Sequence, residues 1–531
     1  MNNGIRLLFT VGVLILSTPT YPQSSTSVLS SQDILQLYKD VKNLNFDESR
    51  VANVENVTFA KDRAIFAFQK GTFYFVEPVR EHITGAIFLG EGSLSLDPPT
   101  EIERAQVRRF LEADSLLETF SAAYLRFTGQ AAHDLIKDLT FTQAEIPDKV
   151  TELHEEISDY FLKERGINLA SGVLGDLLNG AEEGLFFAVL EKKQPELNFS
   201  SYLAFIFEPN ASEEVALFQY FPRRSKKPFY TVCSFHRTND YQSGDAFFST
   251  VEEDDDALQI SHYKMQVKLE KSGKLNTEAE LTYSPLVDNL RFLTFVLYQE
   301  LEVDSVNNVL GETLAFIQEE KEAAFSVILD EPLLPQTEQT LTVYYSGDAL
   351  EPANGNLLLK NKVYWYPRYG YLVPATYDIT FEYPSDWQVI SVGAKIERWE
   401  DGSSAFSRWL EDTPAFGAAF AFGYFDSTTY DSENVLPIKV YSSHSRATSI
   451  RAKIGGDVAN SLYFFESLLG HYPYKHMNVV ETPGVGSQGF PALLFLTSHT
   501  FAREIEGVME ALRGHEVAHQ WWGNLVGWET Y

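Results

Sequence analysis

Hydrophobic and polar residues alternate with a period of two through the middle of the chain. The first alternating run ends at Ser272-Gly273-Lys274, a typical hairpin turn. Such alternation favours strands that bury one face, so the chain from about Leu258 to Tyr430 is predicted to form antiparallel sheet in a sandwich or saddle arrangement. The apolar positions are Tyr263, Met265, Val267 and Leu269, then Tyr377, Ile379, Phe381 and Tyr383.

Beyond Leu436 the spacing of apolar residues becomes helical. They recur every three to four positions on one stripe, which predicts a long helix with one buried face. Residues Asn478 to Glu481 follow as a predicted strand that ends at Pro483. A third, mixed domain is therefore expected to begin here. The stripe consists of Ile450, Ile454, Val458, Leu462, Phe465 and Leu469.

The first part of the chain combines short aromatic strands, predicted at Ala64 to Phe68 and Thr72 to Val76, with helical stretches near Glu101 to Phe127. An acidic run, Glu252 to Asp256, then repels itself and suits a linker better than a calcium loop, because it lacks the ligand spacing and turn glycine of an EF-hand. We expect a multidomain α+β fold. Its domains are predicted at residues 24–250, of unknown function, 257–432 and 433–531.

The length and charge of the chain agree with this organisation and limit its partners. A chain of 531 residues fits about three domains. It carries 74 acidic and 42 basic residues, for a net charge of -32, which repels phosphate backbones and anionic lipid surfaces. Nucleic acid is therefore not expected as a partner, and the oligomeric state stays open.

The N-terminus has the layout of a secretory signal. Arg6 precedes an apolar run from Leu7 to Leu16, and small and turn-forming residues follow. A membrane anchor is the alternative, but the run is shorter than the roughly 20 residues that a spanning helix needs. Residues 1–23 are predicted to be a cleaved signal, which implies a periplasmic or extracellular protein without a transmembrane span in its mature chain.

Cys233 is the single cysteine, which excludes a disulfide within the chain. A reactive thiol with His236 as neighbour is one interpretation, and a buried inert thiol within a strand is the favoured one. The aromatic segment from Tyr364 to Tyr369 has two interpretations as well. It would line a sugar or peptide groove, or pack in the core and at sheet edges, and we expect core and edge packing.

Candidate chemistry is concentrated near the end of the chain. Residues Glu506 to Trp522 are largely helix formers, so His515 and His519 are predicted to lie one turn apart on one helical face. Two imidazoles so placed can bind one zinc ion, and Glu516 beside them can act on a water without being a ligand. Zinc lowers the pKa of its water toward about 7, and Glu516 would remove a proton as general base in peptide hydrolysis.

The motif His515-Glu516-Val517-Ala518-His519-Gln520-Trp521-Trp522-Gly523-Asn524 resembles the active-site helix of the aminopeptidase N (membrane alanyl aminopeptidase) family of gluzincin metallopeptidases. The aromatic-rich strands up to Phe425 resemble the N-terminal β-domain of that family. Residues from Leu436 onward resemble the start of its thermolysin-like catalytic domain. The resemblance implies a zinc-dependent, aminopeptidase-type enzyme with a peptide or protein substrate, and it covers about the second half of the chain.

Two departures from the family pattern qualify the resemblance. The family's third zinc ligand is a glutamate that would fall beyond the last residue, Tyr531, and Glu529 is too close to replace it. A downstream tyrosine that stabilises the oxyanion would also lie beyond Tyr531. The sequence is therefore expected to be a C-terminally truncated fragment whose own activity is open.

The second departure concerns the residues that bind the substrate. In the family, a glutamate in a Gly-Ala-Met-Glu-Asn strand binds the free α-amine of the substrate, and the matching stretch here is Gly486 to Phe490. Gly489 occupies the glutamate position, and Gln488 would replace it only as a neutral acceptor. The stretch is still expected to form an edge strand along which a peptide pairs, with Gln488 and Gly489 as substrate-binding candidates.

The loss of that glutamate motivates an alternative function. A non-catalytic binding or envelope-scaffold protein would keep the peptidase shape without its activity, although such a protein has no need of the full His-Glu-x-x-His motif. His471, His476 and His499 lie in the same predicted domain, and each is interpreted as a surface or satisfied histidine rather than a member of the site.

Overall fold

The fold was analysed in a computed structural model of the chain. The signal predicted at residues 1–23 and the acidic run at 252–256 lie outside the residues that it describes. The described residues are 29–163, 166–192, 201–209, 211, 213–221, 229–237, 257–353, 355–370, 373–433, 435–483, 486–501 and 507–526.

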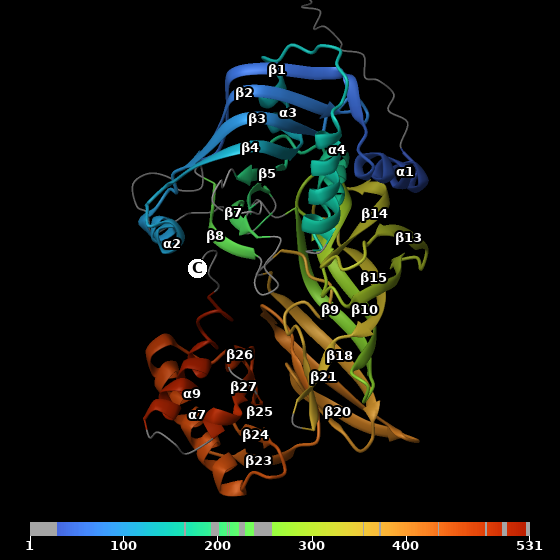
Figure 1. The fold of residues 1–531 in the computed structure, drawn as a ribbon. Helices are drawn as coiled ribbons and strands as arrows, with labels where there is room; N and C mark the ends of the chain where they lie inside the picture. The colour runs from blue at the N-terminus through green and yellow to red at the C-terminus, as the bar shows by residue number, and fades with distance from the viewer. Residues whose placement is uncertain are drawn as a thin grey trace, which may run out of the picture.

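The first part of the chain forms an eight-stranded antiparallel sheet in which each strand pairs with the next in sequence (Figure 1). Its strands are β1 (Phe46–Lys61), β2 (Ala64–Val76), β3 (Gly85–Leu96), β4 (Leu116–Phe127), β5 (Phe186–Lys192), β6 (Ser201–Phe207), β7 (Val215–Tyr220) and β8 (Phe229–Phe235). The helices are α1 (Ser31–Lys42), α2 (Glu101–Leu111), α3 (Gly129–Ile136), α4 (Asp148–Glu155), the π-helix η1 (Glu156–Leu162) and α6 (Leu169–Asn179).

Both faces of this sheet are covered, and this explains one wrong prediction. One core cluster includes residues of α2 and α3, and a second includes residues of α1, α4, η1 and α6. A strand buried on both faces lacks strict alternation. The helix predicted near Glu101 to Phe127 is therefore correct only for α2, since Leu116–Phe127 form strand β4, whose second half from Ala122 to Phe127 is buried throughout.

The middle of the chain forms a ten-stranded sheet, in the order β11-β14-β13-β12-β15-β10-β9-β18-β21-β20. The predicted alternation is confirmed, because every second residue of β18 is buried. β9 and β10 form the predicted hairpin, but β9 and β18 pair in parallel, which corrects the expectation of a purely antiparallel sheet. The strands are β9 (Leu258–Leu269), β10 (Lys274–Pro285), β11 (Leu290–Val296), β12 (Leu301–Asn308), β13 (Thr313–Ile317), β14 (Ala324–Leu333), β15 (Gln339–Asp348), β18 (Ala375–Pro384), β20 (Ala394–Asp401) and β21 (Ser404–Ala415).

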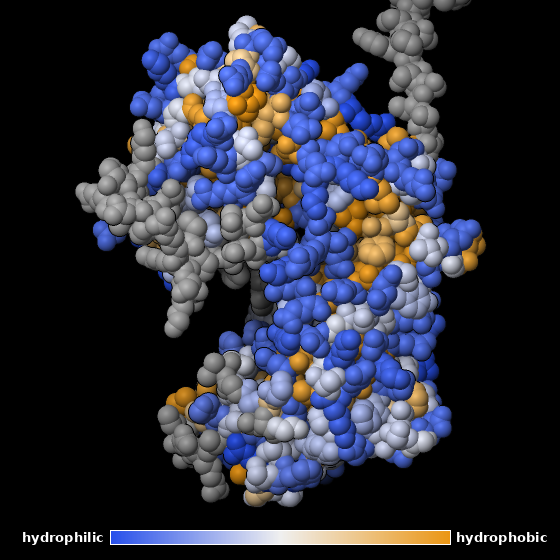
Figure 2. All heavy atoms as spheres, turned by 45° about the vertical axis from the view of Figure 1, so that its right-hand side comes forward, coloured by the Kyte–Doolittle hydropathy of each residue, from blue (hydrophilic) through white to orange (hydrophobic). Residues whose placement is uncertain are grey.

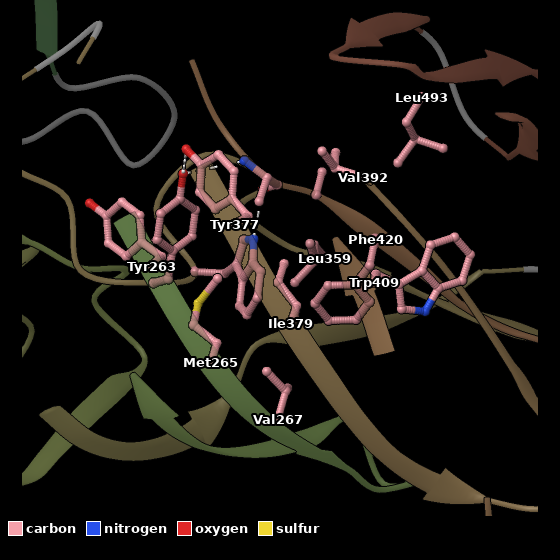
Figure 3. Close-up of a cluster of buried hydrophobic side chains, with 14 of the residues drawn as sticks. Tyr263, Met265, Val267, Leu359, Tyr377, Ile379, Val392, Trp409, Phe420 and Leu493 are labelled. Atoms are coloured by element: carbon pink, nitrogen blue, oxygen red, sulfur yellow. Dashed lines mark hydrogen bonds between the residues drawn. The ribbon is translucent and has the colours of Figure 1, made fainter. Parts of the chain in front are cut away.

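A four-stranded sheet packs against the ten-stranded one. Phe381 of β18 lies 5.0 Å from Phe420 of β22, measured between ring centroids, and Figure 3 shows side chains from both sheets in one cluster. Trp365 and Tyr366 are fully buried in this core, so the core interpretation of their aromatic segment is confirmed for these two residues. The strands of the small sheet are β16 (Leu350–Ala353), β17 (Asn356–Leu359), β19 (Gln388–Ser391) and β22 (Phe420–Gly423).

The last part of the chain is a five-stranded mixed sheet with helices. Its order is β23-β24-β25-β27-β26, with β24, β25 and β27 parallel to one another. The predicted long helix is present as α7, which buries Ile454, Val458 and Leu462. The elements are β23 (Asp426–Tyr430), β24 (Ile438–Ser442), α7 (Thr448–Leu469), β25 (Met477–Thr482), β26 (Gln488–Phe490), β27 (Leu493–Thr497), α8 (Ser498–Phe501) and α9 (Val508–Ala518).

The sheets are joined by shared cores. One cluster runs through the ten-stranded, four-stranded and five-stranded sheets, and Leu493 of β27 belongs to it (Figure 3). Phe292 and Ile328 of the ten-stranded sheet belong to the core beneath α1 and α6. The predicted α+β fold is thus confirmed, with mostly antiparallel sheets and few helices.

The surface reflects the composition of the chain. The face shown in Figure 2 is largely hydrophilic, as expected for a chain with 116 charged residues among 531. Within the described part of the chain, no helix combines the length and the apolar character needed to cross a bilayer.

Candidate metal centre

Helix α9 carries the His-Glu-x-x-His motif. It begins after Gly507, whose N–H donates to the carboxylate of Glu510 at 2.7 Å and so caps the first turn. It ends at Ala518, earlier than the predicted Trp522, because Gln520 and Trp521 bond to carbonyls three residues back and the chain tightens into a turn. The predicted start at Glu506 lies outside the described residues.

The two candidate ligands lie one helical turn apart. The ring centroids of His515 and His519 are 4.8 Å apart, with the ring planes at 84°. The Nδ1 of His519 lies 3.1 Å from the carbonyl oxygen of Trp522. A carbonyl only accepts, so Nδ1 carries the proton, and Nε2 of the neutral ring keeps a lone pair for a metal.

Glu516 lies on the inner side of the same turn. Glu516 is 6% exposed, and its Oε2 has no hydrogen-bond partner among the described residues. Burial raises the pKa of this carboxyl, and the neighbouring His519 and His515 offset part of the rise. A buried acceptor without a partner is uncommon and marks a place where a water or a ligand is expected.

Strand β26 passes directly against this turn of α9. A Cβ placed on Gly489 would lie 2.6 Å from the carbonyl oxygen of Glu516 and 2.9 Å from Cβ of His519. Only a residue without a side chain allows so close an approach. Gln488, the other substrate-binding candidate, is exposed beside it.

Two side chains that follow the motif also reach this strand. The side-chain amide of Gln520 donates to the carbonyl of Phe490 at 3.0 Å and accepts from the N–H of Ala492 at 2.8 Å. Asn524 donates to the carbonyl of Gly489 at 3.3 Å. Both residues stand in the motif that carries the family resemblance, but their spacing gave no sign of these contacts.

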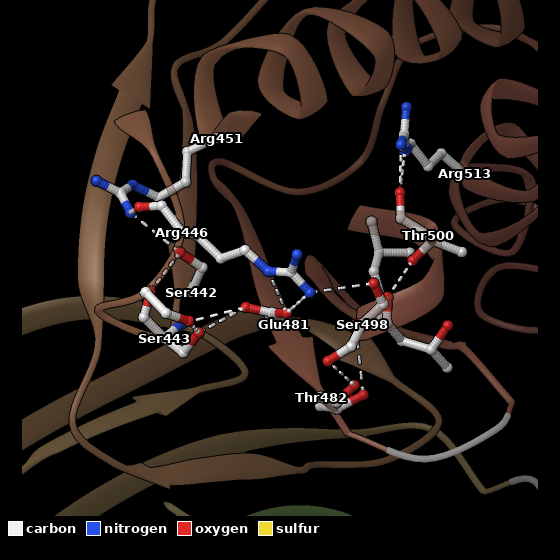
Figure 4. Close-up of polar contacts among 12 residues, drawn as sticks. Ser442, Ser443, Arg446, Arg451, Glu481, Thr482, Ser498, Thr500 and Arg513 are labelled. Atoms are coloured by element: carbon white, nitrogen blue, oxygen red, sulfur yellow. Dashed lines mark hydrogen bonds and ion pairs between the residues drawn. The ribbon is translucent and has the colours of Figure 1, made fainter. Parts of the chain in front are cut away.

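Polar contacts hold α9 against α7 and α8. The guanidinium of Arg513 donates to the carbonyl of Thr500 and forms an ion pair with Asp457 of α7. Figure 4 shows Arg513 above Thr500. In the same view Arg446 forms an ion pair of 2.7 Å with Glu481 at the end of β25. The candidate ligands therefore stand on a helix that is anchored at its inner face.

The other histidines of this region lie in different settings. His471 is exposed and pairs with Glu466 at 2.5 Å, and His499 is exposed. His476 is packed against Glu411 of β21, with its Nε2 4.0 Å from the Oε2 of that carboxyl.

The donor set fits zinc in part. Two imidazoles on one helical face and a nearby carboxylate that binds no metal are the arrangement of a catalytic zinc site, which normally has three protein ligands. Within the described ranges, no three residues of the His, Cys, Asp or Glu type gather as a metal site. Glu529 lies outside those ranges.

Comparisons with known proteins give distant matches that include aminopeptidases and zinc metallopeptidases. No protein-family model matches the chain. Aminopeptidase M1 of Arabidopsis thaliana is 25% identical over 169 residues, which cover 30% of this chain and 19% of that protein. Aminopeptidase M1-A of Oryza sativa subsp. japonica is 26% identical over 170 residues, with the same coverage. The matched part of the chain thus spans about a fifth of the length of these relatives.

Solved structures similar to this chain include M1 zinc metallopeptidases. That of Deinococcus radiodurans has a TM-score of 0.46 at 17% identity and covers 52% of this chain and 66% of its own. A two-domain M1 zinc metallopeptidase bound to L-arginine has a TM-score of 0.46 at 16% identity, with the same coverage.

Proposed function

We propose that this chain carries the metal-binding helix of a zinc-dependent, aminopeptidase-like metallopeptidase. His515 and His519 would be the ligands that α9 supplies, and Glu516 the general base. The observation that carries the proposal is the geometry of one turn, where two imidazoles lie 4.8 Å apart beside a buried carboxylate oxygen without a partner among the described residues. Bound zinc would supply Lewis acidity to this site.

His519 and Glu516 have distinct roles in the proposed reaction. The Nδ1–H of His519 is engaged by the carbonyl of Trp522, which orients the ring and leaves Nε2 for the metal. Glu516 accepts a proton from the attacking water and passes it to the leaving amine. No covalent intermediate forms, so the reaction requires no nucleophilic serine or cysteine.

The substrate in this proposal is a peptide. β26 is the edge strand of its sheet and lies beside the turn with Glu516 and His519, so an extended peptide can pair with it next to the reacting groups. Gln488 and Gly489 are the proposed contacts on this strand. Neither offers a carboxylate to a free α-amine, so peptides with blocked amino termini are expected to be cleaved as well.

The proposal includes the setting of the enzyme. Residues 1–23 are proposed to direct export to a periplasmic or extracellular location. Residues 24–250, 257–432 and 433–531 are proposed as three domains, and the first has no assigned role.

The test measures zinc content and peptide hydrolysis in the native gene product. Glu516→Gln should keep zinc, because the ligands are untouched, and should lose hydrolysis by about 100- to 10,000-fold. Glu510→Gln on the same helix is the matched control, since Glu510 contacts Lys453, Gly507 and Arg513 rather than the motif. Peptides with free and with blocked amino termini are compared in parallel.

Two outcomes would count against this proposal. Equal hydrolysis by wild type and Glu516→Gln would remove Glu516 as the base. A wild-type protein that binds no zinc and cleaves neither peptide would instead support the alternative of a non-catalytic scaffold.

A further inference from the structure

Strand β26 is too short to be fixed by its own ladder. It contains three residues and pairs with β27 through Gln488–Phe495, Gly489–Leu494 and Phe490–Leu493. A ladder of this length on one side is marginal without further support. Its position beside α9 therefore depends on contacts outside the sheet.

Gln520 supplies the first such contact. It is fully buried, and its amide bonds both to the carbonyl of Phe490 and to the N–H of Ala492, which flank the tight turn between β26 and β27. This side chain uses a donor and an acceptor at once. A glutamate keeps the acceptor and loses the donor, and a leucine loses both.

Asn524 supplies the second contact. The chain turns at Gly523, which has a φ of +95° and donates its N–H to the carbonyl of Val526 at 2.7 Å. Asn524 in this turn is buried and donates to the carbonyl of Gly489. The turn that ends the metal-binding helix thus delivers a donor to the middle residue of β26.

We infer that Gln520 and Asn524 are positioning residues, which together clamp β26 against the turn of α9 that carries Glu516 and His519. They thereby set the distance between the reacting groups and a peptide paired with the strand. The clamp itself is independent of activity, and its effect on substrate rests on the proposed function. Neither residue touches the metal or donates to the substrate in this role.

The clamp is tested by hydrogen exchange on the native gene product. Gln520→Glu and Asn524→Asp each remove one donor to the strand, and each is compared with wild type and with the control Glu510→Gln. Loss of one such bond should speed exchange in residues 488–497 by about tenfold. Exchange in α7 should stay within twofold of wild type, and zinc content should not change.

Two results would overturn the clamp. Unchanged exchange in residues 488–497 for both variants would show that the side chains do not hold the strand. A rise of equal size in α7 and in the rest of the five-stranded sheet would show a general structural role. Because Gln520 is fully buried, the variant of Asn524 keeps the test decisive if Gln520→Glu fails to fold.

Kinetics test the second half of the inference. A loosened strand weakens peptide pairing while Glu516 and the ligands stay in place, so KM should rise about tenfold with kcat within about threefold. A fall in kcat at constant KM would place the substrate elsewhere. If wild type cleaves no peptide, the proposed function fails, and the exchange data still decide on the clamp.

Discussion

His476 and Glu411 face each other in the interior, with the Nε2 of the imidazole 4.0 Å from the Oε2 of the carboxyl. Neither of these two atoms has a hydrogen-bond partner among the described residues. The same holds for the Nδ1 of His476 and for the hydroxyl of nearby Tyr474. Burial raises the pKa of Glu411 to about 7 and lowers the pKa of His476 to about 4. The pair joins β21 of the ten-stranded sheet to the loop before β25, and the surface pair Asp412 and Lys475 lies beside it.

The first prediction is a pH-dependent stability that Glu411→Gln removes. The folded pKa of Glu411 lies above its ordinary 4.5, so its contribution is present below pH 4.5 and is lost as pH rises through about 7. The free energy of unfolding of the wild type, measured relative to that of Glu411→Gln, should therefore fall by roughly 2–3 kcal/mol between pH 5 and pH 8, because His476 is present in both proteins. Denaturant unfolding of both proteins at both pH values measures this difference, and a difference that does not change with pH would refute this assignment.

His476 should act in the opposite direction at low pH. Its folded pKa lies below its ordinary 6.5, so its contribution is present above pH 6.5 and is lost as pH falls through about 4. The junction should be most stable between the two limits, near pH 5 to 6.

Gly489→Ala should disturb the candidate site. Its added Cβ would meet the carbonyl of Glu516 and Cβ of His519 well inside contact distance, so β26 and α9 must separate. We expect a destabilisation of about 1–3 kcal/mol and weaker zinc binding. Gly514→Ala on the same helix is the control, because its Cβ would come no closer than 3.4 Å to Ser461. Similar unfolding midpoints for the two variants would contradict the close contact.

Arg513→Met should destabilise the packing of α9 on α7. Arg513 is 2% exposed, and its removal leaves Asp457 and the carbonyl of Thr500 without their partner. A loss of about 3 kcal/mol in the free energy of unfolding is expected. Lys453→Met, which removes an exposed ion pair with Glu510, should have little effect in the same denaturant titration. Equal decreases in the free energy of unfolding for the two variants would show that the burial of Arg513 does not stabilise the fold.

Cys233 should not react in the folded protein. It is fully buried in strand β8, and burial raises the pKa of its thiol to about 12. An alkylating reagent at pH 8 should therefore modify it only after denaturation. Rapid modification of the native protein, followed by mass spectrometry, would contradict the burial. The favoured interpretation of this residue as buried agrees with the structure.

Local patterns predicted those elements whose burial is one-sided. β18 alternates strictly because one face meets the core, and α7 shows its stripe for the same reason. β4 was misread as helix because its sheet is covered on both faces. The parallel pairing of β9 with β18 could not be predicted from the sequence, since the pairing of strands that are distant in sequence leaves no periodic pattern of residues.

The candidate site also combines residues that a local sequence motif predicted with contacts that it did not predict. His515, Glu516 and His519 form a local motif, and their presence on one turn follows from helical spacing. The roles of these three residues stay predictions. Gly489 was interpreted through the carboxylate that it lacks, but its contact with α9 supplies a steric reason for glycine. The contacts of Gln520 and Asn524 arise only when a separate strand is brought to the helix.

The parallel pairing of β9 with β18 imposes an order on biosynthesis. Tyr263 must wait for Tyr377, more than a hundred residues later, before its strand gains its second neighbour. At ribosomal rates of about 5–20 residues per second, the open edge of β9 stays unpaired for roughly 6–20 seconds. Until then, that edge is a site for incorrect pairing between nascent chains.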